Sequence, residues 1–141
     1  MERKASAVWQ GGLKDGKGTL ATESKVLSNT PYSFGTRFEG APGTNPEELL
    51  GAAHAGCFSM ALSAQLGEAG IKPERIETKA TITFEKLESG PTITRSHLDV
   101  TVRAPGADRA KFDTAAQNAK AGCPLSKVLK AEISMEARLE A

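Results

Sequence analysis

Hydrophobic and polar residues alternate over short stretches in the first third of the chain, which is typical of β-strands. The alternation from Ala5 to Gln10 and from Gly18 to Glu23 predicts two strands, joined through the turn Asp15-Gly16-Lys17-Gly18. Residues 26–38 fit a further strand, although Pro31 favours an edge position or a break because proline cannot donate a backbone hydrogen bond. We therefore expect a small N-terminal sheet.

A long apolar stretch without charged residues, from Leu49 to Gly67, replaces this alternation. It is preceded by Asn45-Pro46-Glu47-Glu48, which combines a capping residue, a proline suited to the first helical position and two carboxylates for the first turn. A helix is predicted to run to about Glu68. Its alanines, glycines and polar side chains favour burial in protein over a membrane span. A helix that is apolar all round needs more cover than one small sheet, which favours a dimer.

The remaining residues predict a β-hairpin, two helices and a closing strand. Alternation from Ile76 to Lys86 is followed by a return strand whose inward parity changes, so a bulge is expected near Ser96. Helical spacing covers residues 109–121, a short helix follows from 124, and residues 132–139 alternate again. The fold class is therefore α+β, as a single domain over residues 1–141.

The composition excludes several classes of function. Eighteen basic and 17 acidic residues leave a formal net charge of +1, and no run of like charge favours nucleic acid or a membrane surface. The N-terminus has no apolar core of a secretory signal, so a reducing cytoplasm is the expected location.

Two cysteines, Cys57 and Cys123, are the only thiols. Cys57 lies in the apolar stretch and is expected to be buried. Cys123 precedes Pro124 and is expected at a helix N-terminus, where free backbone N–H groups would favour its thiolate. The two are either unrelated core residues or one redox couple, and their settings alone leave both interpretations open.

One face of the predicted long helix carries candidate chemistry. Steps of three and four residues align Glu47, Leu50, His54, Cys57, Ala61 and Ala64. A core seam with a tolerated histidine is the simplest interpretation. A reactive Cys57 would need a cation, because an apolar setting raises the pKa of a thiol. Arg37, which lies shortly before the helix, is the candidate. We expect no metal site, because His54 and Cys57 are the only helically paired ligands.

Three segments together resemble a known family. Residues 45–62, with His54 and Cys57, are similar to the reactive-cysteine helix of the osmotically inducible protein C (OsmC) peroxidases, which share a superfamily with the organic hydroperoxide resistance (Ohr) proteins. Residues 119–129 resemble the second-cysteine segment, and residues 31–40 resemble the arginine loop of the OsmC branch.

This resemblance implies an intertwined homodimer in which a long buried central helix packs between antiparallel sheets. It implies a thiol peroxidase without metal or cofactor. Cys57 would attack the hydroperoxide and become a sulfenic acid, with which Cys123 condenses to a disulfide. Arg37 would hold the thiolate, and Glu47 would orient Arg37. A dithiol donor, such as a lipoylated protein, would reduce the disulfide. The implied role is defence against oxidative and osmotic stress.

Organic hydroperoxides are the expected substrates, because apolar residues accompany the two cysteines. The candidate substrate contacts are Phe58, Met60 and Leu125, with His54.

Ten residues of helix separate Glu47 from Cys57 by about 15 Å, so we expect the active site to use both subunits. A different class of function stays open, namely a non-catalytic stress-related dimer or a carrier of apolar ligands with structural thiols.

Overall fold

The computed structural model describes residues 1–141, which form two compact units, Met1–Leu49 and Leu50–Ala141. The chain is α+β, with two three-stranded sheets and one long helix. The division between the units falls within the first turns of that helix.

The N-terminal unit contains the predicted small sheet. Strands β1 (Ala5–Gln10), β2 (Lys17–Thr22) and β3 (Thr30–Tyr32) pair antiparallel in the order β1-β2-β3. Gly18 is required on β2, because a Cβ there would lie 2.4 Å from the ring of Tyr32 and 2.6 Å from that of Trp9. These two rings pack with centroids 5.4 Å apart, so the glycine allows an aromatic pair to lie across the sheet.

The prediction of a strand as far as residue 38 was wrong. The strand ends at Tyr32, and helix α1 occupies Phe34–Phe38. The cause is a capping box: the Ser33 hydroxyl accepts from the Thr36 backbone N–H, and the Thr36 hydroxyl accepts from the Ser33 N–H. Two reciprocal bonds satisfy N–H groups that a new helix otherwise leaves unpaired.

Helix α2 (Pro46–Glu68) begins and ends as predicted. Asn45 Oδ1 accepts from the Glu48 N–H at 2.8 Å, which caps the first turn. At the other end Gly70 has φ +76°, and the Ile71 N–H bonds to the Leu66 carbonyl at 2.8 Å. This is a Schellman ending, which needs a residue that adopts the left-handed region without strain.

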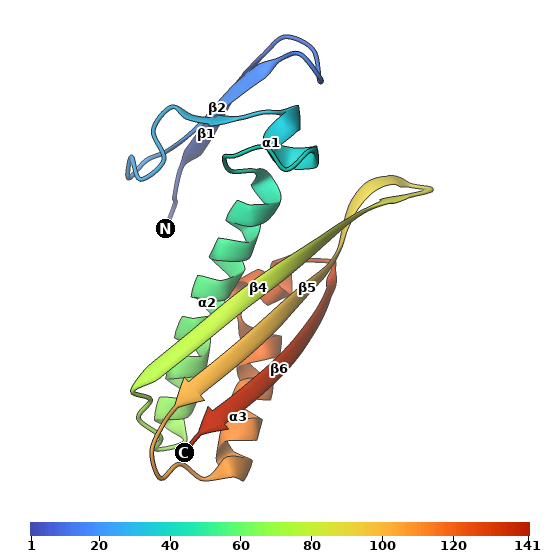
Figure 1. The fold of residues 1–141 in the computed structure, drawn as a ribbon. Coiled ribbons are helices and arrows are strands. Elements are labelled where there is room, and N and C mark those ends of the chain that lie inside the picture. Colours follow the sequence, from blue (N-terminus) through green and yellow to red (C-terminus); the bar gives the residue numbers. More distant parts are fainter. The chain divides into compact units, whose positions relative to one another are not determined.

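The C-terminal unit is built on the sheet β4-β5-β6 (Figure 1). Strands β4 (Arg75–Leu87) and β5 (Gly90–Arg103) form the predicted antiparallel hairpin. The expected bulge is present two residues before Ser96: Thr83 pairs with Arg95 and Phe84 pairs with Ile93, which leaves Thr94 as the extra residue. Beyond it Ser96, Leu98 and the valines of β5 face the core.

The prediction of antiparallel sheets was wrong for the last strand. Strand β6 (Glu132–Glu140) pairs parallel to β5. The reason lies in the connection, since α3 (Arg109–Gly122) and α4 (Pro124–Val128) carry the chain back along the sheet before β6 begins. Parallel neighbours need such a crossover.

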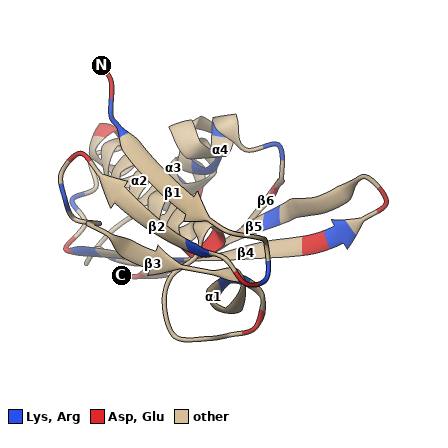
Figure 2. Cartoon of the chain, turned by 90° about the horizontal axis from the view of Figure 1, so that it is seen from above, with Lys and Arg blue, Asp and Glu red and all other residues tan.

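One face of this sheet is covered by α3 and by the part of α2 that belongs to the C-terminal unit (Figure 1). The core between these layers consists of fully buried apolar side chains, the largest being Phe58, Phe112, Leu62, Leu66 and Leu98. Figure 2 shows acidic and basic residues spread over strands, helices and loops, with neither sign gathered on one element.

Helix α2 is less covered within one chain than the sequence led us to expect. One sheet covers one face of a helix, so Phe58 and Leu62 are buried while Gly56 and Met60 on the other face are exposed. By its length and its mean hydropathy of 1.2, α2 could also cross a membrane, and 28% of that apolar window is buried. Core helices of globular proteins have the same length and composition.

Candidate active site

The two cysteines lie together in the C-terminal unit, although 66 positions separate them in the sequence. Both are free thiols, and their sulfur atoms are 3.1 Å apart. Helix α2 supplies Cys57, and the junction between α3 and α4 supplies Cys123. A disulfide bond is about 2.05 Å long, so closure needs an approach of about 1 Å. The redox-couple interpretation of the two thiols therefore has the geometry it requires.

Cys123 stands at a helix N-terminus as predicted, but the burial of the two thiols differs from the expectation. Cys123 is fully buried and belongs to the apolar core, whereas Cys57 is half-buried. Cys123 is the N-cap residue of α4, but its side chain accepts no capping hydrogen bond. Instead the backbone N–H of Leu125, the second residue of α4, donates to Cys57. The N-terminus of α4 therefore provides a hydrogen-bond donor to Cys57, not to Cys123.

Cys57 is not activated by its own unit. Desolvation raises the pKa of the Cys57 thiol, and the neighbouring sulfur of Cys123 raises it further, while the Leu125 N–H acts in the opposite direction. A thiolate is the nucleophilic form of cysteine, so a reactive Cys57 needs an additional positive charge.

His54 lies one turn before Cys57 on α2 and is fully buried. Its Nδ1 is hydrogen-bonded to the Ser96 hydroxyl at 2.6 Å, and its Nε2 to the Ser126 hydroxyl at 2.9 Å. Burial lowers the pKa of His54, which favours the neutral ring. One ring nitrogen then donates and the other accepts, and a hydroxyl can take either role. The imidazole therefore joins α2, β5 and α4, with no surface left for a substrate.

The other expected substrate contacts lie in different surroundings. Phe58 is fully buried in the core and offers no surface either. Met60 is 79% exposed on the open face of α2. Leu125 packs partly buried against the core beside Cys57. Met60 and Leu125 are thus the two of the four whose side chains a substrate could reach.

Arg37 and Glu47 form an ion pair within the N-terminal unit. Arg37 Nη2 lies 2.6 Å from Glu47 Oε1, and Arg37 Nε donates to both carboxylate oxygens at 3.1 and 3.2 Å. The side chain of Glu47 is 13% exposed and that of Arg37 is 34% exposed. Two guanidinium nitrogens on one carboxylate fix the plane of the guanidinium. Glu48 is engaged elsewhere, since its carboxylate accepts from the Thr44 hydroxyl.

A cavity of about 260 Å³ lies beside this arginine in the same unit. Its walls are mostly aromatic and aliphatic, and they are formed by Trp9, Leu13, Tyr32, Ser33, Phe34, Arg37 and Phe38. Two ring pairs stiffen it, with centroids 4.9 Å apart for Phe34 and Phe38. An apolar wall next to a cation suits a ligand with one polar and one apolar end.

Sequence reasoning missed Ser96, Ser126 and, apart from Arg37, the residues that line this cavity. Ser96 could have been found, because it shares the inward parity of Leu98 on β5, and a buried hydroxyl needs a partner. Ser126 lies in a one-turn helix, where spacing gives no such signal.

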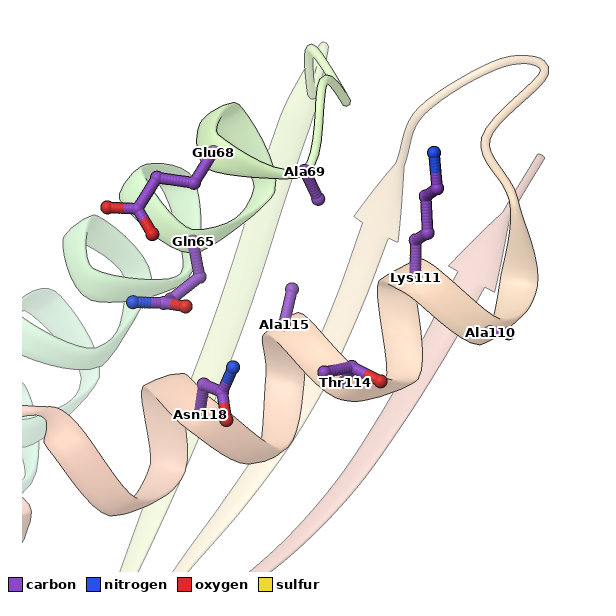
Figure 3. A pocket seen from close by; sticks show the side chains of 8 residues that line it. All are labelled: Gln65, Glu68, Ala69, Ala110, Lys111, Thr114, Ala115 and Asn118. Atoms are coloured by element: carbon purple, nitrogen blue, oxygen red, sulfur yellow. The ribbon is translucent and has the colours of Figure 1, made fainter.

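A further pocket of about 410 Å³ lies away from both cysteines, between the end of α2 and α3 (Figure 3). Gln65 and Glu68 of α2 line it on one side, and Lys111, Thr114 and Asn118 of α3 line it on the other. None of the predicted site residues lines this pocket. No cluster of three or more His, Cys, Asp or Glu side chains could hold a metal ion.

Comparison with known proteins places the chain in a family. The family model described as OsmC-like protein matches residues 38–138. The chain belongs to this family. Among OsmC-like relatives, it is 54% identical over 140 residues to peroxiredoxin OsmC of Escherichia coli strain K12, covering 99% of this chain and 98% of that protein. It is 27% identical over 123 residues to an organic hydroperoxide resistance protein of Xanthomonas axonopodis pv. citri, covering 84% and 83%.

Solved structures of the family share the fold. The organic hydroperoxide resistance protein OhrB of Bacillus subtilis superimposes with a TM-score of 0.68 at 26% identity, over 97% of this chain and 98% of that one. The OsmC-like protein of Mycoplasma pneumoniae gives a TM-score of 0.77 at 14% identity, over 100% and 99%. The α+β architecture with its long helix is therefore that of the OsmC-like family.

Proposed function

We propose that this OsmC-like protein is a cysteine-dependent peroxidase that reduces organic hydroperoxides, and hydrogen peroxide less well. The observation that carries the proposal is the 3.1 Å separation of two free sulfurs, one half-buried and one fully buried. The names of the relatives, a peroxiredoxin and organic hydroperoxide resistance proteins, support the same chemistry.

The proposed cycle has two steps on the protein. The Cys57 thiolate attacks the distal oxygen of the hydroperoxide; the O–O bond breaks, the alkoxide takes a proton and leaves as an alcohol, and Cys57 becomes a sulfenic acid. The Cys123 sulfur then attacks the Cys57 sulfur and expels the hydroxyl as water, which leaves a disulfide. A dithiol donor, such as a lipoylated protein, returns both thiols by exchange.

The cation that Cys57 needs is proposed to be Arg37, oriented by Glu47. The bidentate geometry of that pair supports the assignment, because it fixes the guanidinium plane. Since ten helical residues, about 15 Å, separate Glu47 from Cys57, we propose that a homodimer supplies the pair and the thiols from different subunits. The whole chain, residues 1–141, would act as one OsmC-like domain of that dimer.

The substrate class is proposed from the cavity beside Arg37. Its volume of about 260 Å³ suits the alkyl or aryl group of an organic hydroperoxide, with the peroxide toward the guanidinium. Met60 and Leu125 are proposed as further contacts near Cys57. The cycle requires no metal or organic cofactor. Its proposed role is defence of the cytoplasm against oxidative and osmotic stress.

The decisive test is a thiol count after mixing the reduced protein with tert-butyl hydroperoxide. Loss of two thiols per chain to an intramolecular disulfide is expected. Cys57→Ser should abolish peroxide consumption, whereas Cys123→Ser should allow one turnover and leave an over-oxidisable Cys57. If both thiols persist in excess peroxide, the peroxidase is refuted.

That negative outcome would favour the alternative, a carrier of apolar ligands. One observation gives it a site: the N-terminal unit contains a second cavity of about 400 Å³, lined by Ala5, Ser6, Leu20, Ala21, Thr22, Val26, Leu27 and Leu49. Binding of a fluorescent fatty acid, lost on Val26→Asp, would then identify the carrier.

A further inference from the structure

Cys123, the proposed resolving cysteine, directly precedes the short helix α4. It is five residues long and contains no fully buried residue, and it follows directly on Cys123. A single helical turn is marginal by itself, so contacts with other elements must hold it. The position of the Cys123 sulfur therefore depends on what fixes the segment from Cys123 to Ser126.

Three polar contacts tie this segment to α2. The Cys123 sulfur contacts the Cys57 sulfur, and the Leu125 N–H donates to the same sulfur. The third is the bond between the Ser126 hydroxyl and His54 Nε2. The first two end on the reacting atom and change when it is oxidised. The His54–Ser126 bond is the one that does not include that atom.

We infer that His54 and Ser126 are a positioning pair, which keeps Cys123 beside Cys57 while the Cys57 sulfur is oxidised, a role that rests on the peroxidase cycle proposed above. His54 suits it because Ser96 fixes its other nitrogen and the ring is fully buried. The imidazole thus has one orientation, and its Nε2 is presented to α4 from a rigid core.

The consequence is chemical. A sulfenic acid that meets the Cys123 thiol loses water and becomes a disulfide, which exchange can reverse. A sulfenic acid that meets a second hydroperoxide first takes another oxygen and becomes a sulfinic acid, which is not readily reversed. Holding Cys123 in place raises the rate of the first reaction and leaves the rate of the second unchanged. The positioning pair therefore sets how many turnovers precede inactivation.

The test measures that partition in the reduced, full-length protein. Wild type and Ser126→Ala receive tert-butyl hydroperoxide with dimedone present, and mass spectrometry separates disulfide, dimedone-trapped sulfenic acid and sulfinic acid. Loss of one hydrogen bond is expected to raise the combined share of trapped sulfenic and sulfinic acid about two- to tenfold. The rate of the first oxidation of Cys57 should stay unchanged. Ser126→Thr keeps the hydroxyl and should restore the wild-type partition.

The matched control is Ser59→Ala, which removes another hydroxyl of α2, bonded to the Ala55 carbonyl and the Thr78 hydroxyl, but leaves His54 and α4 untouched. It should lower thermal stability while changing the partition much less than Ser126→Ala. Equal effects of the two variants, or a wild-type partition in Ser126→Ala, would overturn the positioning role.

A readout without peroxide separates this role from the proposed activity. Oxidised glutathione converts Cys57 to a mixed disulfide, and attack by Cys123 then closes the intramolecular bond. Closure should be about two- to tenfold slower in Ser126→Ala than in wild type. If peroxide oxidises no variant but this difference is present, the peroxidase fails and the positioning stands; equal closure rates refute the positioning.

Discussion

Oxidation of Cys57 and Cys123 to a disulfide is predicted to stabilise the folded protein substantially. The two residues are 66 positions apart, so the bond closes a long loop in the unfolded chain. The chain-entropy relation gives about 4 kcal/mol at 25 °C for a loop of this length. The sulfurs already lie 3.1 Å apart in the dithiol form, so closure needs little movement of the folded state. We expect a net gain of about 2–4 kcal/mol in the free energy of unfolding.

This gain can be converted into a melting shift. For 141 residues the unfolding entropy near the midpoint is about 0.3 kcal/mol per kelvin. The predicted rise in Tm is therefore about 7–14 °C. Differential scanning calorimetry would compare reduced and oxidised protein at one concentration, because the Tm of the proposed dimer would depend on concentration. Cys123→Ser, treated with the same oxidant, should show no rise.

An oxidised form with an equal or lower Tm would refute the reasoning. It would mean that the disulfide forms only after part of the native structure opens, and the α3–α4 junction is the segment that would have to move. The close approach of the sulfurs would then not describe the state in which the bond forms.

Three further predictions concern His54, the cavity beside Arg37 and the open face of α2. Burial lowers the pKa of His54 below 6.5, so just below that pH the unfolded chain binds a proton that the folded chain does not. The free energy of unfolding should therefore fall as the pH drops below about 6.5, and it should level off below the pKa of His54 in the folded protein. Urea titrations of His54→Gln should lack this slope, and an identical slope would contradict it. Leu13→Ser removes about 1 kcal/mol of apolar contact from the cavity beside Arg37, so it should lower kcat/KM for cumene hydroperoxide about fivefold. The value of kcat/KM for hydrogen peroxide should not change. Val26→Ser, in the second cavity, is its control, and parallel losses for both peroxides would exclude a substrate pocket. A Cβ at Gly56 meets nothing within 4 Å in one chain, so the Gly56→Leu variant should fold. It should nevertheless weaken the proposed dimer, as measured by analytical ultracentrifugation. An undiminished dimer would show that the exposed face of α2 is not part of the interface.

Local chemistry in the sequence predicted the elements that carry the candidate site. The side chain of Asn45, the proline after it and the glycine at position 70 determine where α2 begins and ends, and each acts through its nearest neighbours. The parity change in β5 likewise revealed a bulge from the residues themselves. These features depend on neighbours within a few positions, so the order of residues is enough to predict them.

Other features depend on contacts between distant segments, which the sequence does not reveal. The parallel pairing of β6 follows from the path of the crossover, and alternation in β6 is the same for either direction. The relative burial of the two thiols was predicted wrongly, because the apolar neighbours of Cys57 do not tell which face of α2 the sheet covers. The 3.1 Å contact between the sulfurs depends on that packing as well, so the pairing was expected from the family resemblance and not from the residue pattern.

The crossover between β5 and β6 also has a consequence for the newly made chain. Cys57 is synthesised 66 positions ahead of Cys123, and the strand that completes the sheet is the last to appear. At about 5–20 residues per second, Cys57 waits roughly 3–13 s for its partner thiol. In the C-terminal unit burial raises its pKa rather than lowering it. If the second subunit supplies the activating cation, as proposed, Cys57 becomes reactive only when the dimer assembles. The growing chain then does not expose a reactive Cys57 before Cys123 is present to form the disulfide.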